Sequence, residues 1–396
     1  MRYNFDEVID RSGTNSAKWD KKTLQEMFGV EDVLPFWVAD MDFKAARPIV
    51  DAVVKQAEHG IYGYSSRPDS YYEAIINWTK RRHGWEIKRE WIEFTPGVVP
   101  AINYAIQAFC MPGDKIMIQN PVYYPFHGAI ENNGCHIVDN TLKLNGDYYE
   151  IDFADFEKKA KDPKLTLFIL CSPHNPVSRV WTKEELEKIG DICCKNNVIV
   201  LADEIHNDLV FSRYKHTMFA SIKEEFAANS ITCTAPSKTF NLAGMQASNI
   251  IIKNPVLREK FERILEKNAI GGQNPFSIAA LEAAYNECED WLDQLLDYLE
   301  ENIRFIHYYL AEHLPKAKLI EPQGTYLGWL DLREYEPNGK KLESVVYKKG
   351  KVALDGGTWF GRGGDGFIRL NFACPKILLA QGLERISKAI NEEYSK

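Results

Sequence analysis

Lys238 is the residue whose surroundings point most strongly to chemistry. It lies in residues 230–244, Ser-Ile-Thr-Cys-Thr-Ala-Pro-Ser-Lys-Thr-Phe-Asn-Leu-Ala-Gly, a β-prone run that breaks at Pro236 before a turn of small residues. Burying a lysine cation among apolar and small residues is costly, so its pKa falls and its amine becomes available as a nucleophile or base. Such an amine can form a Schiff base with a carbonyl cofactor. Most lysines are exposed side chains without such a role, so the case depends on the neighbouring segments.

Two upstream segments supply that context. Residues 165–176 form an apolar run that ends in polar residues around Asn175, and residues 198–208 form another that ends at Asp203. Both patterns predict buried strands with polar groups at their carboxyl ends, where open α/β sheets bind ligands. A lysine, an aspartate and an asparagine after three strands are the groups that a pyridoxal phosphate (PLP) site requires. The aspartate keeps the pyridine nitrogen protonated, so that the ring acts as an electron sink, and the lysine carries the cofactor.

Composition excludes several other classes of protein. The 396 residues favour two domains, and the net charge of −8 leaves no basic surface typical of nucleic-acid binding. The eight cysteines are scattered through apolar segments, which predicts reduced thiols in a cytoplasmic protein and no metal site. We expect no signal peptide and no membrane span, because no apolar run approaches the roughly 20 residues that a span needs.

Strand and helix patterns alternate through most of the chain, which predicts a layered α/β domain with a mostly parallel sheet. Strands are expected at 115–119, 136–141, 165–171, 198–203, 230–235 and 248–252, and helices at 48–59, 70–83, 97–110, 124–133 and 183–195. A helical region over 279–314 precedes shorter strands at 325–332 and 366–372 and a closing helix at 377–394. We therefore predict a large domain over 48–287 and a smaller α+β domain built from 288–396 and the irregular lead of residues 1–47.

Three motifs together resemble the fold-type I PLP enzymes: Ser-Pro-His-Asn-Pro (172–176), Ala-Asp-Glu-Ile-His (202–206) and residues 235–244. More narrowly, they are similar to the MalY/PatB branch of carbon–sulfur β-lyases, which includes cystalysin. The resemblance extends over nearly the whole chain, through the segments 16–20, 37–43, 97–100, 120–126, 324–326 and 369–371.

The resemblance implies roles for the residues around the cofactor. Lys238 would be the Schiff-base lysine and the base that removes the Cα proton. Asp203 would pair with the pyridinium nitrogen, although an acid at this point could merely cap a helix. Asn175 would donate to the phenolic oxygen, which is compatible with an ordinary Asn-Pro turn. His206 is a second candidate for that oxygen, and its alternative is a structural histidine.

Further residues are implied to hold the phosphate and the substrate. Tyr123 would stack on the cofactor ring and protonate the departing sulfur, whereas Tyr124 is either a substrate contact or packing. Arg369 would bind the α-carboxylate in bidentate fashion, unless it is a surface arginine. Tyr64 would reach the phosphate of the neighbouring subunit, which implies a homodimer. The remaining phosphate contacts would be Val98, Val99 and Ser237, whose alternatives are a plain helix entry and a turn.

The implied reaction is cleavage of L-cystathionine, L-cysteine or a related cysteine S-conjugate to pyruvate, ammonia and a thiol. Two alternatives stay open at this point. An aminotransferase uses the same electron sink, and a PLP-binding regulatory protein would carry out the lyase reaction only incidentally while its surface binds a partner.

Two further local features of the sequence are Ser178 and the glycines of 361–366. The family usually has glycine at the turn occupied by Ser178, so a positive φ there would cost on the order of 1 kcal/mol. The glycines of 361–366 match a dinucleotide-binding spacing, but that pattern must open a helix, and here a strand is expected to follow. We expect a mobile loop near the site instead.

Overall fold

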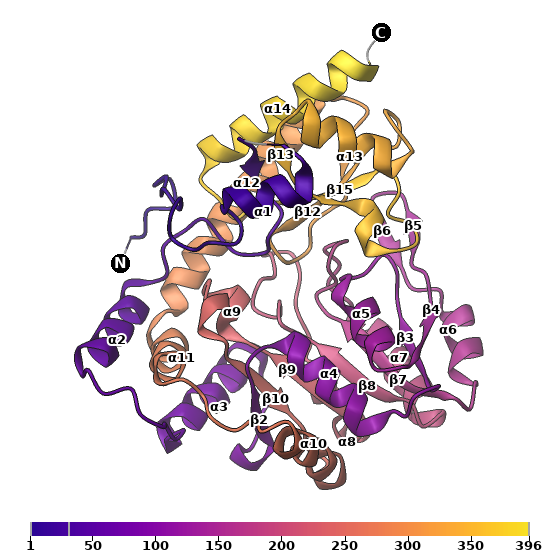
Figure 1. The fold of residues 1–396 in the computed structure, drawn as a ribbon. Helices are drawn as coiled ribbons and strands as arrows, with labels where there is room; N and C mark the ends of the chain where they lie inside the picture. Colours follow the sequence, from indigo (N-terminus) through magenta and orange to yellow (C-terminus); the bar gives the residue numbers. More distant parts are fainter. Residues whose placement is uncertain (1, 31, 395–396) are drawn as a thin grey trace.

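The core of the large domain is a seven-stranded sheet with the strand order β2-β10-β9-β8-β7-β3-β4 (Figure 1). The structure is a computed structural model that describes residues 2–30 and 32–394. The strands are β2 (Ile92–Thr95), β3 (Lys115–Ile118), β4 (His136–Asp139), β7 (Leu165–Cys171), β8 (Ile199–Asp203), β9 (Ser230–Thr234) and β10 (Ser248–Ile251). Only β10 runs antiparallel to its neighbours, so the prediction of a mostly parallel sheet is confirmed.

Helices cover both faces of this sheet, which explains why its strands are almost continuously apolar. Along β7, Leu167 and Ile169 face one helical layer, whereas Phe168 and Leu170 face the other. The first layer contains α4 (Val98–Phe109), α5 (Pro125–Asn132) and α10 (Pro255–Lys267), and the second contains α6 (Phe153–Ala160), α7 (Lys183–Lys195) and α8 (Glu224–Ala228). The register pairs Cys171 with Asp203 and Asp203 with Cys233, so the carboxyl ends of β7, β8 and β9 meet at one edge.

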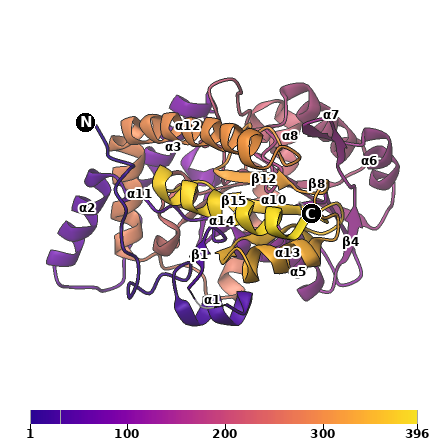
Figure 2. The ribbon, with the colours of Figure 1, turned by 90° about the horizontal axis from the view of Figure 1, so that it is seen from above.

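The smaller domain has an antiparallel sheet with the order β11-β12-β15-β14. Its strands are β11 (Lys318–Leu319), β12 (Leu327–Asp331), β14 (Asp355–Gly356) and β15 (Phe367–Asn371). Its helices are α12 (Glu289–His313), α13 (Gly339–Lys348) and α14 (Lys376–Tyr394). Seen from above, α12 and α14 run side by side over this sheet (Figure 2). The predicted second α+β domain is thus present.

The remaining elements connect or flank the two domains. A parallel pair, β1 (Leu34–Pro35) and β13 (Val352–Ala353), joins the N-terminal lead to the small domain. The other elements are α2 (Arg47–Glu58), α3 (Asp69–His83), α9 (Pro236–Thr239), α11 (Pro275–Glu287), the hairpin β5 (Lys143–Asn145) and β6 (Tyr148–Glu150), and the 3₁₀ turns η1 (Arg89–Trp91), η2 (Phe219–Ser221), η3 (Ala243–Met245) and η4 (Gly357–Phe360).

The prediction of an irregular lead is wrong for α1 (Lys21–Phe28). Asp20 caps this helix by accepting from the Thr23 backbone N–H, and Gly29 ends it with a φ of 69°. Its buried residues Leu24 and Phe28 pack against Trp37 and Ala353, so the helix depends on tertiary contacts as well as on its caps. The glycines of 361–366 lead into β15 and not into a helix, as expected.

Candidate active site

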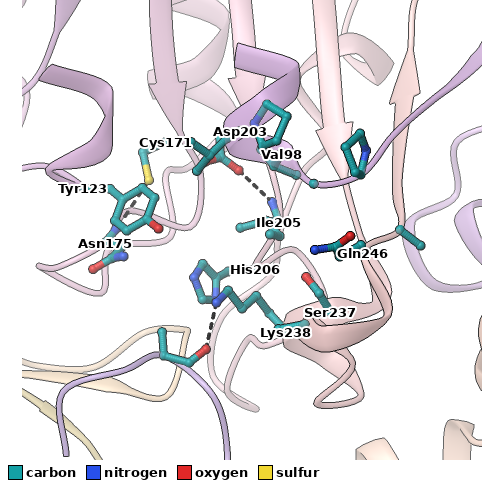
Figure 3. Close-up of a pocket in the computed structure, with 17 residues that line it drawn as sticks. Val98, Tyr123, Cys171, Asn175, Asp203, Ile205, His206, Ser237, Lys238 and Gln246 are labelled. Atoms are coloured by element: carbon teal, nitrogen blue, oxygen red, sulfur yellow. Dashed lines mark hydrogen bonds between the residues drawn. The ribbon is translucent and has the colours of Figure 1, made fainter. Parts of the chain in front are cut away.

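One cavity of about 190 Å³ lies at the edge where β7, β8 and β9 end (Figure 3). It brings together eight of the predicted site residues, which come from five separate segments of the chain. These residues are Val98, Val99, Tyr123, Asn175, Asp203, His206, Ser237 and Lys238. Tyr64, Tyr124 and Arg369 do not line it.

Lys238 lies on the short helix α9, which follows β9 directly. Its Nζ donates a hydrogen bond to the backbone carbonyl of Ala39 at 2.7 Å. Burial, together with the positive charge of Arg369, lowers the pKa of Lys238 to about 8. A substantial fraction of the amine is therefore neutral near physiological pH, as a nucleophile or base requires.

Asp203 is the last residue of β8, and its side chain is buried. It accepts one hydrogen bond, at 3.2 Å, from the backbone N–H of Ile205. Burial raises its pKa to about 7, although the Ile205 N–H and the charge of Lys238 act in the opposite direction. A cationic N–H donor placed against this carboxylate would restore its charge, and a pyridinium nitrogen is such a donor.

His206 and Asn175 both line the cavity (Figure 3). The His206 ring is buried, and its Nδ1 has no hydrogen-bond partner among the described residues. Burial lowers the pKa of His206 well below its ordinary value, so the ring is neutral. A structural histidine would have its buried nitrogen satisfied, and this one keeps a nitrogen available for a ligand. Asn175 accepts from Arg369 Nη1 at 3.0 Å.

Tyr123 and Tyr124 have different surroundings. Tyr123 lines the cavity, and burial raises the pKa of its phenol above the ordinary value, so it stays protonated. Tyr124 does not line the cavity, and its ring packs edge-on against Trp359 and Phe360 at centroid distances of 5.9 and 5.6 Å. Tyr124 thus has clear packing partners, whereas Tyr123 is placed to meet a ligand.

The part of the cavity lined by the start of α4 suits an anion. Val98 and Val99 begin α4, so their backbone N–H groups have no acceptor within the helix, and the helix dipole adds positive potential there. Ser237 supplies a hydroxyl from α9, and Gln246 supplies a side-chain amide from just after η3. Together these groups can hold a phosphate.

Arg369 lies on β15 in the small domain and is buried, so the surface-arginine alternative is wrong. Its guanidinium donates to Asn175 Oδ1, to the Trp37 carbonyl at 2.9 Å and to Asp355. Its Nε has no partner among the residues that the structure describes, so one donor is free. Tyr64 is fully exposed, at 111% of its reference surface, in the loop between α2 and α3.

Nine residues that line the cavity were not among the predicted site residues, and four of them are Ala39, Cys171, Ile205 and Gln246. Cys171 and Ile205 lie next to predicted site residues, either along the chain or across the sheet, so their positions could have indicated that they line the site. Ala39 lies in the segment 37–43, which had served only as a mark of resemblance. Gln246 follows a turn of unremarkable composition, and nothing in its immediate sequence indicates a ligand contact.

The donor set fits the PLP expected from the sequence. Lys238 offers an amine for a carbonyl carbon, Asp203 is a buried carboxylate that forms no ion pair with a described residue, and the start of α4 offers free N–H groups for a phosphate. Among the described residues no group of His, Cys, Asp and Glu is suited to a metal ion. Within residues 2–30 and 32–394, no helix is both long and apolar enough for a transmembrane span.

Comparisons with known proteins agree with this geometry. The chain is 47% identical over 388 residues to the cystathionine β-lyase PatB of Bacillus subtilis, covering 98% of this chain and 100% of PatB. The structure of cystalysin from Treponema denticola, which contains PLP, matches with a TM-score of 0.96 at 39% identity, covering 99% and 100% of the two chains. A PLP-bound protein of Clostridium difficile 630, provisionally described as an aminotransferase, matches with a TM-score of 0.96 at 47% identity, covering 98% and 100%.

The family model described as aminotransferase class I and II matches residues 31–386, which is most of the chain. That range extends over both domains and includes every residue that lines the cavity. This protein therefore belongs to the aminotransferase class I and II family.

Proposed function

We propose that this chain is a PLP-dependent carbon–sulfur β-lyase that cleaves L-cystathionine, L-cysteine or related cysteine S-conjugates to pyruvate, ammonia and a thiol. The observation that carries the proposal is the pairing of Lys238 and Asp203 in one cavity, both with perturbed pKa values, in a chain 47% identical to a cystathionine β-lyase. PLP, when bound, supplies the electron sink that stabilises the charge left on Cα after proton removal.

Lys238 serves as the base in this proposal. Its lowered pKa, about 8, leaves enough neutral amine near pH 7 to accept a proton from Cα, and the same value makes its conjugate acid a usable donor afterwards. Asp203 would hold the ring nitrogen of the cofactor, because a cationic partner would lower the pKa that burial raises and so keep the carboxylate charged.

Arg369 orients the substrate by its α-carboxylate. The free Nε is the donor that a carboxylate oxygen can take, and the contacts to Asn175 and Asp355 hold the guanidinium plane in place. Because Arg369 lies on β15 and Lys238 lies on α9, the distance between these two elements then sets where the substrate's Cα lies relative to Lys238.

Tyr123 donates a proton to the departing sulfur. Its raised pKa keeps the phenol protonated at neutral pH, and Tyr123 lines the cavity. Sulfur leaves far more readily as a neutral thiol than as a strongly basic thiolate, so a proton from Tyr123 favours elimination.

We also infer a cytoplasmic homodimer with composite sites. Tyr64 is fully exposed beside Tyr62 and Ile61, which are 60% and 69% exposed, and such a cluster of large side chains is typical of a surface covered by another subunit. The eight cysteines are all free thiols, which suits a reducing compartment.

An aminotransferase is the second candidate, favoured by the Clostridium difficile protein and its 47% identity. The two reactions share proton removal by Lys238. They differ afterwards, because transamination leaves the Cβ substituent in place, whereas elimination expels it.

A product assay separates them. The purified PLP-loaded protein is given L-cystathionine with and without an α-keto acid, and pyruvate, homocysteine and transferred amino groups are measured. The proposal expects pyruvate and homocysteine in equal amounts without the keto acid. Amino transfer that requires the keto acid, with no pyruvate, would instead establish an aminotransferase.

A further inference from the structure

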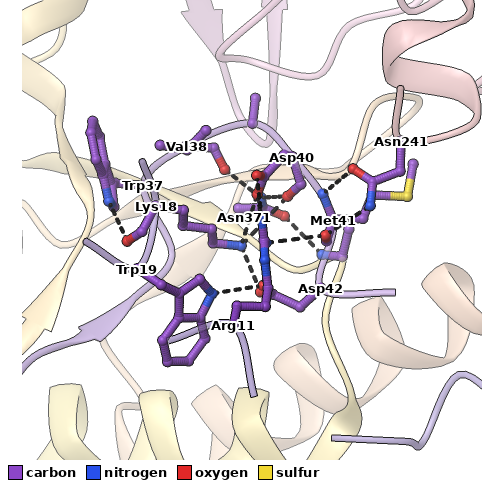
Figure 4. Close-up of polar contacts among 12 residues, drawn as sticks. Arg11, Lys18, Trp19, Trp37, Val38, Asp40, Met41, Asp42, Asn241 and Asn371 are labelled. Carbon is purple, nitrogen blue, oxygen red and sulfur yellow. Dashed lines mark hydrogen bonds and ion pairs between the residues drawn. The ribbon is translucent and has the colours of Figure 1, made fainter. Parts of the chain in front are cut away.

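Two N-terminal motifs, Lys18-Trp19 and the segment Trp37–Phe43, have no role in the chemistry described above. The structure places them together (Figure 4), and Ala39 of the second motif lines the cavity. We call residues Trp37–Phe43 the strap.

The strap presents backbone carbonyls to the catalytic groups. The Ala39 carbonyl accepts from Lys238 Nζ at 2.7 Å and from the Tyr326 hydroxyl at 2.8 Å. The Trp37 carbonyl accepts from Arg369 Nη2 at 2.9 Å. The base and the carboxylate-binding arginine are therefore both held by the same short stretch of backbone.

Two asparagines tie the strap to both domains. Asn241, three residues after Lys238, donates to the Met41 and Phe43 carbonyls at 2.9 and 3.0 Å and accepts from the Met41 N–H at 2.9 Å. Asn371, two residues after Arg369, donates to the Val38 and Asp40 carbonyls at 2.7 and 2.6 Å. The strap position is thus fixed relative to both Lys238 and Arg369.

The strap is fixed on its other side by Asp42, which is only 4% exposed. Asp42 receives Lys18 Nζ at 2.6 Å, Arg11 Nη1 at 2.6 Å and Trp19 Nε1 at 2.9 Å. Lys18 is fully buried, so removing the charge of Asp42 would leave a buried cation without its closest partner. The Lys18-Trp19 motif therefore binds Asp42 through both of its side chains.

We propose that Asp42 is a positioning residue that, through the strap, fixes the Ala39 carbonyl as the acceptor that holds the free Lys238 amine at the cavity. A neutral amine that donates one N–H to Ala39 directs its lone pair by that bond, so the strap sets the direction from which Lys238 attacks a carbonyl or removes a proton. This inference builds on the proposed function only in taking Lys238 as the reacting amine.

The test compares wild type, Asp42→Asn and Glu7→Gln. Glu7→Gln is the matched control, because it also turns a carboxylate of the N-terminal lead into an amide but breaks only the exposed ion pair with Lys44. The first measurement is the rate at which cofactor-free protein captures PLP on Lys238, followed by absorbance. Asp42→Asn should slow capture about tenfold or more, since a misplacement of 1 Å costs on the order of 100-fold in rate, and Glu7→Gln should match wild type.

The second measurement uses L-cystathionine deuterated at Cα on the loaded enzymes. Asp42→Asn should lower kcat with little change in KM and enlarge the isotope effect, because a misplaced base slows proton removal. Capture and isotope effect that both equal wild type in folded Asp42→Asn would overturn the proposal. Slow capture in Asp42→Asn while wild type gives no elimination would support the strap and refute the lyase.

A milder variant covers the case in which Asp42→Asn does not fold. Trp19→Phe removes one hydrogen bond to Asp42 from a partly exposed ring and leaves both ion pairs in place. It should shift capture and isotope effect in the same direction by a smaller factor. Wild-type values for both in Trp19→Phe, together with an unfolded Asp42→Asn, would reduce Asp42 to a purely structural residue.

Discussion

At Lys238 and Asp203, burial disfavours the charged form of both side chains, and the two consequences are complementary. The lysine becomes a better nucleophile, while the aspartate is left short of a positive partner. The cofactor's carbonyl and ring nitrogen satisfy both at once, so each residue is poised for the group it is proposed to hold.

The pKa of Lys238 leads to a pH dependence of cofactor capture. Only the neutral amine attacks the carbonyl, so the capture rate should rise about tenfold per pH unit below 8 and level off above it, following a pKa of about 8. Stopped-flow absorbance of cofactor-free protein mixed with PLP measures this rate. A rate that still climbs at pH 9.5 would mean an ordinary lysine, whose pKa is near 10.4.

Removing the phenol of Tyr123 should affect elimination according to the leaving group. Tyr123→Phe should lower kcat on L-cystathionine on the order of 100-fold, the usual effect of losing a general acid. An S-aryl cysteine conjugate, whose thiolate leaves without a proton, serves as the control and should lose far less. Equal losses on both substrates would remove Tyr123 from the role of acid.

For individual residues, the sequence predicted which polar side chains would lie together where they follow buried strands, and their roles remain predictions. Asn175, Asp203 and Lys238 share a cavity because parallel strands end at one edge, and that rule needs no coordinates. Ala39 escaped prediction because its contribution is a backbone carbonyl, which leaves no trace in side-chain type.

Among the elements, the loop between β7 and α7 contains Ser178, where the resemblance led us to expect a glycine. Ser178 has a φ of 57°, as a glycine could adopt without strain, and its Oγ donates to the Leu327 carbonyl of β12 at 2.5 Å. Its own carbonyl accepts from the Gln323 N–H at 3.0 Å. The serine therefore keeps the glycine-like turn and adds a contact between the domains.

Two substitutions separate the strain at Ser178 from its hydrogen bond. Ser178→Ala and Ser178→Gly both lose the hydroxyl, but only glycine also relieves the positive φ. The free energy of unfolding of the glycine variant should exceed that of the alanine variant by about 1 kcal/mol. Urea denaturation of the PLP-loaded proteins, followed by tryptophan fluorescence, gives both values, and equal stability would mean that this φ is not strained.

Element boundaries were predictable where the sequence contains a cap. The helix expected at 183–195 matches α7, since Thr182 and Glu185 form a capping box at its start. The short helix α1 was missed, although Asp20 and Gly29 bracket it, because only Leu24 and Phe28 are buried and their partners Trp37 and Ala353 come from elsewhere.

For the whole molecule, the proposed homodimer makes each cavity depend on two chains. Co-expressed Lys238→Ala and Tyr64→Ala subunits should form hybrids in which one site has both an intact Lys238 and an intact Tyr64. Activity of the hybrid should clearly exceed that of either variant alone. Mixing without any gain, in a protein that sedimentation shows to be dimeric, would place Tyr64 outside the neighbouring site.

Two domains were predictable from the change in strand and helix pattern near residue 288, and the boundaries 48–287 and 288–396 remain predictions. What the sequence could not provide is the way in which the N-terminal lead connects the domains. The pairing of β1 with β13 and the contacts of Asn241 and Asn371 with the strap join segments up to 333 residues apart. Such contacts have no local signature.

The most direct test of the central claim is to locate the cofactor on the chain. The PLP-loaded protein is reduced with borohydride, digested and analysed by mass spectrometry, with Lys238→Ala in parallel. We expect the phosphopyridoxyl group on Lys238, and in Lys238→Ala neither a label nor measurable turnover. A label on another lysine, or full lyase activity in Lys238→Ala, would contradict the assignment of this cavity as the active site.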